Sequence, residues 1–270
     1  MREELEVSPP GEPEPTPNSN NIIYNVNSSK GKRKIKGALA KELWRVFLSG
    51  EGVIVFIEGP LGRGKSTYAL KVAYQLHGDW DKVLEYLVFT PLQFKDLVER
   101  LLECNERVPC IIWDDVCYWL GALKYFSYDP LYSGILGHMN TLRTYTGAII
   151  MTGPHDSCLP RPVLEMGYVY KYKTSIQKGG FDRKMGKPKR KAVTIKRKQR
   201  KDGTFYWDHH DKLVDWFYLG TIPEDVWFRY NEIRKSYVEL ANRMIEVAKK
   251  HSKFSILLRI ASGELKCWEG

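Results

Sequence analysis

The stretch VIVFIEGPLGRGKST, residues 53–67, decides the fold of this 270-residue chain. Its first five residues form an apolar run typical of a buried strand, and an amphipathic segment typical of a helix begins at Lys65. Between them, Gly59, Gly64, Lys65 and Ser66 match the pattern G-x-x-x-x-G-K-[ST]. In a strand–loop–helix context, this pattern predicts a loop that binds polyphosphates.

Each residue type in the loop has a chemical reason. Glycines let the backbone curl so that successive amide groups point at phosphate oxygens, and the following helix adds the positive end of its dipole. We expect Lys65 to reach the β- and γ-phosphates of ATP, Ser66 to bind Mg²⁺ and Thr67 to lie near the α-phosphate. The predicted nucleotide-binding residues are Gly59, Pro60, Leu61, Gly62, Arg63, Gly64, Lys65, Ser66 and Thr67.

The segment CIIWDD, residues 110–115, places two carboxylates directly after another apolar run. A Mg²⁺ ion on phosphates needs a carboxylate at the tip of a neighbouring parallel strand. Asp114 is therefore the predicted metal ligand, and Asp115 is predicted to orient or deprotonate the attacking water. An apolar run ending in Asp-Asp is also typical of an ordinary turn, but its position one strand–helix unit after the loop favours the metal site.

Apolar runs alternate with amphipathic segments through the first two thirds of the chain. This alternation predicts an α/β fold in which a parallel sheet is covered by helices on both faces. The expected strands are residues 53–57, 86–89, 110–113, 148–151 and 168–176.

After Ile176 the pattern changes to the period-two alternation of antiparallel strands. Residues 171–201 carry fourteen Lys and Arg against one Asp, which accounts for most of the net charge of +10. We predict that residues 178–201 form a basic β-hairpin that binds DNA, although a solvated or lipid-facing basic loop is an alternative. The aromatic residues available to stack on single-stranded bases are Tyr170, Tyr172, Phe205, Tyr206 and Trp207.

The chain is predicted to have four regions. Residues 1–21 are an acidic, Pro-rich tail expected to be disordered, and residues 22–176 are the expected ATPase core. Residues 177–222 are the expected basic hairpin region, and residues 223–270 are the expected helical region. Aromatic and aliphatic residues recur there at three- and four-residue steps from Glu224 toward Lys249, which predicts one long helix used for packing or self-association.

Cysteine content and hydropathy indicate where the protein acts. The five cysteines are odd in number and include no CxxC pair, which predicts reduced thiols rather than disulfides or a zinc site. The longest apolar runs are shorter than a bilayer span, and the N-terminus lacks a signal-peptide core. We therefore expect a cytoplasmic protein without membrane contact.

These motifs resemble those of the P-loop NTPases with an additional strand between the phosphate loop and the acidic motif, the group of AAA+ and RecA-like ATPases. The resemblance covers about residues 50–175. It implies that Thr152, at the end of the run AIIMT, senses the γ-phosphate. It also implies that an arginine completes the site of a neighbouring subunit, and Arg161 and Arg143 are both candidates.

Two features depart from that group: Asp115 stands where AAA+ proteins usually have Glu, and no helical lid precedes residue 176. The segments WDDV, NTLRT and GTIPEDVWFRYNEIRKSYV resemble small ATPases encoded by crenarchaeal plasmids and viruses. The nucleotide motifs and the basic segment together predict a Mg²⁺-dependent, self-associating ATPase that acts on DNA, and replication initiation, helicase loading, translocation or plasmid or virus genome maintenance would all fit it. A small-molecule or nucleotide kinase, with residues 178–201 as its lid, and a nucleotide-gated DNA-binding switch with little hydrolysis are the alternatives.

Overall fold

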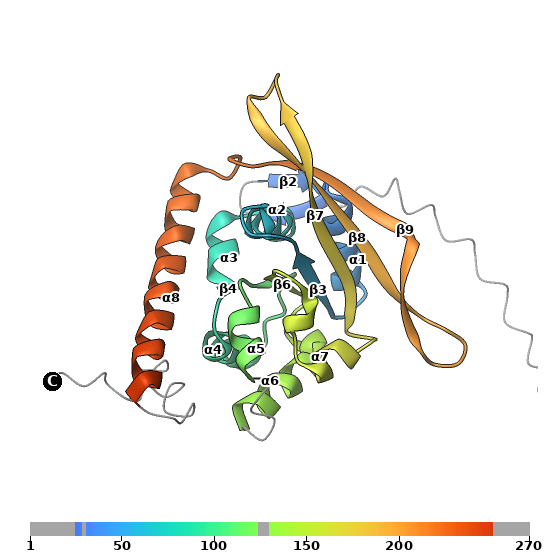
Figure 1. The fold of residues 1–270 in the computed structure, drawn as a ribbon. Helices are drawn as coiled ribbons and strands as arrows, with labels where there is room; N and C mark the ends of the chain where they lie inside the picture. Colours follow the sequence, from blue (N-terminus) through green and yellow to red (C-terminus); the bar gives the residue numbers. More distant parts are fainter. Residues whose placement is uncertain (1–24, 29–30, 124–129, 251–270) are drawn as a thin grey trace, which may run out of the picture.

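A computed structural model describes residues 25–28, 31–123 and 130–250, and the tail expected over residues 1–21 lies outside them. The described chain forms a seven-stranded sheet with helices on both faces (Figure 1). In spatial order the strands are β4 (Leu87–Val88), β5 (Ile111–Trp113), β6 (Ala148–Gly153), β3 (Val53–Glu58), β7 (Tyr170–Asp182), β8 (Lys187–Gln199) and β9 (Phe205–Tyr218).

The sheet has two halves that differ in strand direction. The parallel half consists of β4, β5, β6 and β3, and β7 joins β3 in parallel. The antiparallel half consists of β7, β8 and β9, in which each strand pairs antiparallel with the next. The predicted mixed α/β class is confirmed. The predicted boundary between residues 176 and 177 falls inside β7, so the sheet is continuous across it.

Alternating side chains of β3 divide the core into two layers. Val53, Val55 and Ile57 pack into one apolar cluster, while Ile54 and Phe56 pack into the other. The first cluster lies under α1 (Ala38–Leu48), α2 (Lys65–His77), α3 (Trp80–Glu85) and part of α8 (Glu224–Lys250). The second lies under α4 (Pro91–Glu103), α5 (Cys117–Leu123), α6 (Pro130–Asn140) and α7 (Arg161–Glu165).

Short elements complete the described chain. β1 (Asn25–Ser28) and β2 (Gly31–Lys34) form a separate antiparallel pair. The 3-10 helices η2 (Leu142–Thr144) and η3 (Asp156–Cys158) flank β6. Within the described residues, no helix combines the length and apolarity that crossing a membrane would need.

Asp215 of β9 fixes the antiparallel half to the helical layer. Gly37 precedes α1 and has no side chain to cap it, and the carboxylate of Asp215 accepts hydrogen bonds from the backbone N–H groups of Ala38 (2.7 Å) and Leu39 (3.1 Å). The same carboxylate accepts a hydrogen bond from the hydroxyl of Tyr68 on α2 at 2.7 Å. A negative group at a helix N-terminus is stabilising, so Asp215 serves as a cap supplied from a distant strand.

Candidate nucleotide-binding site

The glycine-rich loop connects β3 to α2 at the carboxyl end of the parallel strands. Gly62 (φ +70°) and Gly64 (φ +94°) take the left-handed conformation that glycine adopts most easily. A Cβ atom at Gly64 would lie 2.5 Å from Cδ2 of Leu219, in the connection between β9 and α8. Gly64 is therefore required both by its backbone conformation and by the close approach of a distant segment.

Lys65 lies buried at the start of α2, with its side chain directed back into the loop. Its Nζ donates to the carbonyl oxygens of Gly59 (2.8 Å) and Pro60 (3.2 Å). Burial lowers the pKa of Lys65, and the nearby charges of Asp115 and Asp114 oppose that shift. An ammonium group held by carbonyls inside such a loop fits a phosphate ligand, whose oxygens could replace these acceptors.

Asp114 is a buried carboxylate surrounded by three hydroxyl groups. It accepts hydrogen bonds from Ser66 Oγ (3.1 Å) and Thr152 Oγ1, and from the hydroxyl of Tyr230 on α8 (2.5 Å). Burial, and next the charge of Asp115, raise its pKa, whereas these hydrogen bonds oppose the shift. Ser66 and Asp114, the predicted metal ligands, therefore lie together, and their oxygen atoms are of the kind that Mg²⁺ prefers.

Asp115 has an uncommon backbone conformation for a residue other than glycine, with φ of +50°. Its N–H donates to Thr152 Oγ1 at 3.0 Å, so Thr152 contacts both acidic residues. Its carboxylate accepts a hydrogen bond from Arg234 Nη2 at 3.0 Å. Two contacts from different elements thus hold Asp115 in a conformation that costs of the order of 1–3 kcal/mol.

A pocket of about 590 Å³ lies above the loop. Its walls combine the loop and Asp115 with residues of the β9–α8 connection and of α8. The lining residues are Leu61, Gly62, Gly64, Lys65, Ser66, Thr67, Asp115, Leu219, Gly220, Ile222, Glu224, Trp227 and Arg234.

Arg234 and Tyr230 are site residues that the sequence reasoning missed. The aromatic stripe of α8 indicated a packing helix, and Tyr230 does pack in the core. No local motif marks Arg234, whose partner Asp115 is 119 positions away. The spacing of Tyr230 and Arg234, four residues apart on one helix, is a signal that can be interpreted only once α8 is known to lie beside the carboxylates.

The two arginines predicted to act across a subunit interface do not line this pocket. Arg161, on α7, is 85% exposed in its side chain and pairs with Glu165 at 2.6 Å. Arg143, on η2, lies beside Gly52, which precedes β3, and therefore at the opposite end of the parallel strands from the loop. A role for either in a neighbouring copy stays a prediction.

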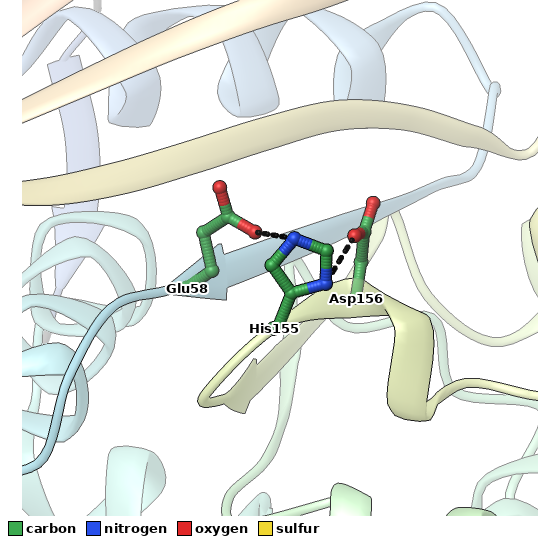
Figure 2. A group of neighbouring side chains, drawn as sticks. All are labelled: Glu58, His155 and Asp156. Atoms are coloured by element: carbon green, nitrogen blue, oxygen red, sulfur yellow. Dashed lines mark ion pairs between the residues drawn. The ribbon is translucent and has the colours of Figure 1, made fainter.

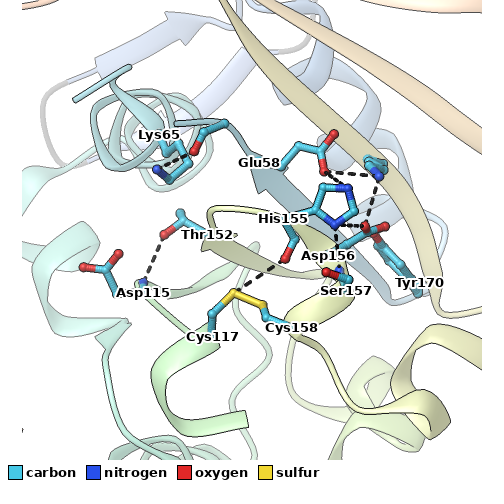
Figure 3. The surroundings of a disulfide bond; sticks show 12 residues. Glu58, Lys65, Asp115, Cys117, Thr152, His155, Asp156, Ser157, Cys158 and Tyr170 are labelled. Atoms are coloured by element: carbon cyan, nitrogen blue, oxygen red, sulfur yellow. Dashed lines mark hydrogen bonds and ion pairs between the residues drawn. A yellow bond between two sulfur atoms is a disulfide. The ribbon is translucent and has the colours of Figure 1, made fainter. Parts of the chain in front are cut away.

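A disulfide joins Cys117 to Cys158, contrary to the expectation of reduced thiols (Figure 3). Cys117 begins α5, just after Asp115, and Cys158 ends η3, just after β6. Because β5 and β6 are neighbouring strands, the segments that leave their carboxyl ends meet, although the cysteines are 41 positions apart. Of the other described cysteines, Cys104 is exposed and Cys110 buried, both as free thiols; Cys267 lies outside the described residues.

A second charged cluster lies beside the disulfide, formed by Glu58, His155 and Asp156 (Figure 2). Three such groups within reach of one another suggest a metal site. However, Lys173 Nζ lies 3.1 Å from Glu58 Oε2 and 3.0 Å from Asp156 Oδ1. The ammonium group of Lys173 pairs with both carboxylates, so this cluster is an ion-pair network that joins β3, β7 and η3.

The fold and site define a mixed α/β protein with a glycine-rich loop at the carboxyl end of its parallel strands. No family model matches the chain. It is 30% identical to the uncharacterized protein B-251 of Sulfolobus spindle-shape virus 1 over 221 residues, which are 75% of this chain and 81% of that protein. The chain therefore belongs to the family of that viral protein.

Two further proteins are similar to this chain, one over a shorter stretch and the other at a lower sequence identity. The uncharacterized protein ORF286 of Acidianus two-tailed virus is 32% identical over 123 residues, and the match spans 43% of this chain and 41% of that protein. The flagellar accessory protein FlaH from Methanocaldococcus jannaschii has 14% sequence identity and a TM-score of 0.29, covering 69% of this chain and 99% of FlaH. A structural likeness of that size carries no argument about function.

Proposed function

We propose that this protein binds and hydrolyses ATP with Mg²⁺ and acts on DNA. The proposal depends on one observation: Ser66 Oγ and Asp114 Oδ1 lie 3.1 Å apart at the start of α2 and the end of β5, beside the buried ammonium of Lys65. This combination of hydroxyl, carboxylate and lysine suits a magnesium-bound polyphosphate.

The residues of the site would divide the work. Lys65 would donate to phosphate oxygens in place of the loop carbonyls, and Ser66 and Asp114 would hold Mg²⁺. The ion would neutralise charge on the β- and γ-phosphate oxygens. Asp115 would accept a hydrogen bond from the attacking water, and Thr152 would keep both carboxylates in position.

Arg234 gives this site a cation from the same chain. It lies in the pocket and pairs with Asp115, so its guanidinium could exchange that carboxylate for a phosphate oxygen. We propose this role for Arg234 in addition to the arginine from a neighbouring copy. Self-association of the protein is part of the proposal, and Arg161 or Arg143 would reach into the nucleotide site of the neighbouring copy.

The same pocket offers apolar surface for the base. Leu219, Ile222 and Trp227 line it, and Trp227 is 37% exposed. A flat aromatic ring next to two aliphatic side chains suits the ring system of a nucleotide.

DNA is the proposed partner because of the positive charge of the antiparallel half. Residues 178–201 span the end of β7, the turn and β8, and they hold the densest run of Lys and Arg in the chain. Such a surface attracts nucleic-acid phosphates in a salt-dependent manner.

The test compares Lys65→Ala with the wild-type protein in ATP hydrolysis, with and without single- and double-stranded DNA across a salt series. We expect turnover to fall at least about 100-fold, because the loop loses its one buried cation. Lys95→Ala, which removes an exposed lysine paired with Glu99 on α4, is the matched control and should leave turnover unchanged. No detectable heat on titrating MgATP into the wild-type protein would sink the proposal.

A nucleotide-gated switch is the second candidate function, favoured by the pairing of Asp115 with Arg234. While that pair persists, Asp115 is less available to a water molecule. Tight MgATP binding with almost no phosphate release would favour the switch. The kinase alternative has less support, because among the described residues none from 178–201 lines the pocket that such a lid would close.

A further inference from the structure

The antiparallel half has one face that no helix covers in the described part of the chain. Along β9, Leu213, Asp215 and Phe217 turn toward α1 and α2, where Asp215 caps α1 and the ring of Phe217 lies 5.1 Å from that of Tyr68. The alternate residues Lys212, Val214 and Trp216 are exposed. We call this side of β8 and β9 the open face; it carries Lys189, Lys191, Lys212, Val214 and Trp216.

Trp216 lies across the open face. It pairs with Lys191 of β8 in the strand register and is 52% exposed. Its ring extends past β8 to β7, where a Cβ atom at Gly179 would lie 2.8 Å from Cζ3. Gly179 does not have a positive φ, so glycine is needed at this position because a side chain would collide with the indole and not because of the backbone conformation. The absence of a side chain at Gly179 therefore leaves room for the ring of Trp216.

Two ammonium groups accompany this ring. Lys189 Nζ lies 4.5 Å from the ring centre, and Lys191 Nζ lies 5.7 Å from it. Val214, which is 41% exposed, adds apolar surface next to the ring along β9. An exposed aromatic ring with cations beside it can stack on a base while the cations bind the flanking phosphates.

The other aromatic residues expected to stack on bases are less suitable. Tyr170 and Tyr172 are 1% and 0% exposed, because they pack in the two core layers instead. Phe205 and Trp207 are only partly exposed, and Tyr206 is 37% exposed against 52% for Trp216. Aromatic residues at alternate positions of a strand more often pack in a core than stack on bases, and Tyr170 and Tyr172 do pack in the core.

We propose that the open face binds single-stranded DNA, with a base stacked on Trp216 and the neighbouring phosphates on Lys189 and Lys191. Single-stranded DNA fits better than duplex, because the bases of a duplex are already stacked on one another and present no free face to an indole. This inference rests on the proposed action on DNA and specifies the form of DNA and the residues that bind it.

The experiment measures binding of fluorescent oligothymidylate by anisotropy at one fixed salt concentration. We expect Trp216→Ala to weaken binding by about 5- to 150-fold, since one stacked base contributes about 1–3 kcal/mol. Trp216→Phe should retain most of the affinity. Phe228→Ala removes another exposed aromatic, on α8, and is the matched control.

Two further variants separate loss of stacking from loss of fold. Gly179→Ala should displace the indole and weaken binding without removing any aromatic group. Lys189→Ala should lower the salt dependence of log affinity by about one unit of slope. Equal thermal unfolding midpoints of wild type and Trp216→Ala would show that the fold is intact; if that variant unfolds, Gly179→Ala and Lys189→Ala decide the matter.

Several results would overturn the inference. Unchanged oligothymidylate affinity in folded Trp216→Ala would do so, as would an equal loss for duplex DNA, or tighter binding of RNA of matched sequence or of anionic lipid vesicles. Lys65→Ala should bind oligothymidylate as the wild type does. A protein that binds through Trp216 but lacks ATP turnover would contradict the ATPase proposal alone, and the reverse result would contradict this inference alone.

Discussion

The parallel and antiparallel halves of the sheet contribute to one candidate site in different ways. The parallel half supplies the ends of β3, β5 and β6, and with them Lys65, Asp114 and Thr152. The antiparallel half continues into α8, which supplies Tyr230 and Arg234 from 116 and 119 positions away. The motif residues of the candidate site therefore come from local sequence at strand ends, whereas Tyr230 and Arg234, which contact the two carboxylates, come from long-range packing.

Three of the contacts that join the two halves lie close to the loop and the start of the helical layer. Asp215 caps α1, Leu219 lies against Gly64, and Lys71 of α2 donates to Thr221 Oγ1 at 2.5 Å. In Figure 1, β9 runs along the helical layer before the chain turns into α8. Changes on β9 are therefore positioned to reach the loop, and each half can be perturbed separately to learn which one governs the site.

The largest expected effect comes from removing the disulfide between Cys117 and Cys158, which follow neighbouring strands of the parallel half. We expect Cys158→Ser to lower the free energy of unfolding by about 4 kcal/mol, because the disulfide closes a long loop in the unfolded chain. Denaturant unfolding with and without reductant measures this change. Cys104→Ser, at an exposed free thiol, is the control and should unfold as the wild type does. Alkylation of both Cys117 and Cys158 in the folded, unreduced protein would contradict the prediction.

The parallel half was the more predictable part of the molecule. Its strands are short apolar runs, and the residues that end them are local in sequence, so the approach of Ser66 to Asp114 could be anticipated from a motif and from strand adjacency. The disulfide could not be anticipated from the sequence, because the spacing of Cys117 and Cys158 matches no known pattern. The two cysteines come together only because β5 and β6 are neighbouring strands.

In the antiparallel half, the sequence predicted which segments form strands or a helix, but it did not predict which residues of these elements contact one another. Period-two alternation indicated the strands, and the spacing of aromatics indicated α8. Which face of α8 meets Asp114 is set by how the helix packs, and the capping of α1 by Asp215 joins residues 177 positions apart. Long-range contacts of this kind leave no local pattern for a single sequence to reveal.

The second prediction sharpens the comparison from the side of α8. We expect Arg234→Ala to lower ATP turnover by about 100-fold, because a cation aimed at developing negative charge is lost while the motif residues remain. Arg229→Ala, one turn earlier on α8, removes an exposed arginine paired with Asp81 and is the matched control. Arg234→Lys should be intermediate, since it keeps the charge and loses the planar fork.

Steady-state turnover and MgATP affinity should be measured together for these variants. Unchanged or faster turnover in Arg234→Ala would mean that the arginine restrains Asp115 and takes no part in the reaction. The parallel half would then be sufficient for turnover, and α8 would be an inhibitory element.

The smallest expected effect concerns the carboxylate that both halves share. Burial raises the pKa of Asp114 in the folded protein above its ordinary value of 3.8, so the folded state binds this proton more tightly than the unfolded state. The resulting stabilisation is complete below 3.8 and is lost as pH rises through the folded pKa. Once the carboxyl group has lost its proton, the buried charge opposes folding, and the hydrogen bonds from Tyr230, Ser66 and Thr152 offset part of that cost.

Asp114→Asn keeps the shape of the side chain and removes its charge; one oxygen still accepts hydrogen bonds, and the NH2 group that replaces the other can donate to an oxygen such as that of Tyr230. We expect this variant to be more stable than the wild type by about 1–2 kcal/mol at neutral pH, and the difference to vanish toward about pH 4. Urea unfolding across that range, without Mg²⁺, measures the difference in the free energy of unfolding, with Asp96→Asn at an exposed position on α4 as the control.

MgATP should narrow the difference, because a bound cation neutralises the carboxylate of the wild type alone. A difference that stays constant with pH would show that the charge of Asp114 is already balanced by the groups of α8, and that the antiparallel half, more than the metal, sets the electrostatics of the site.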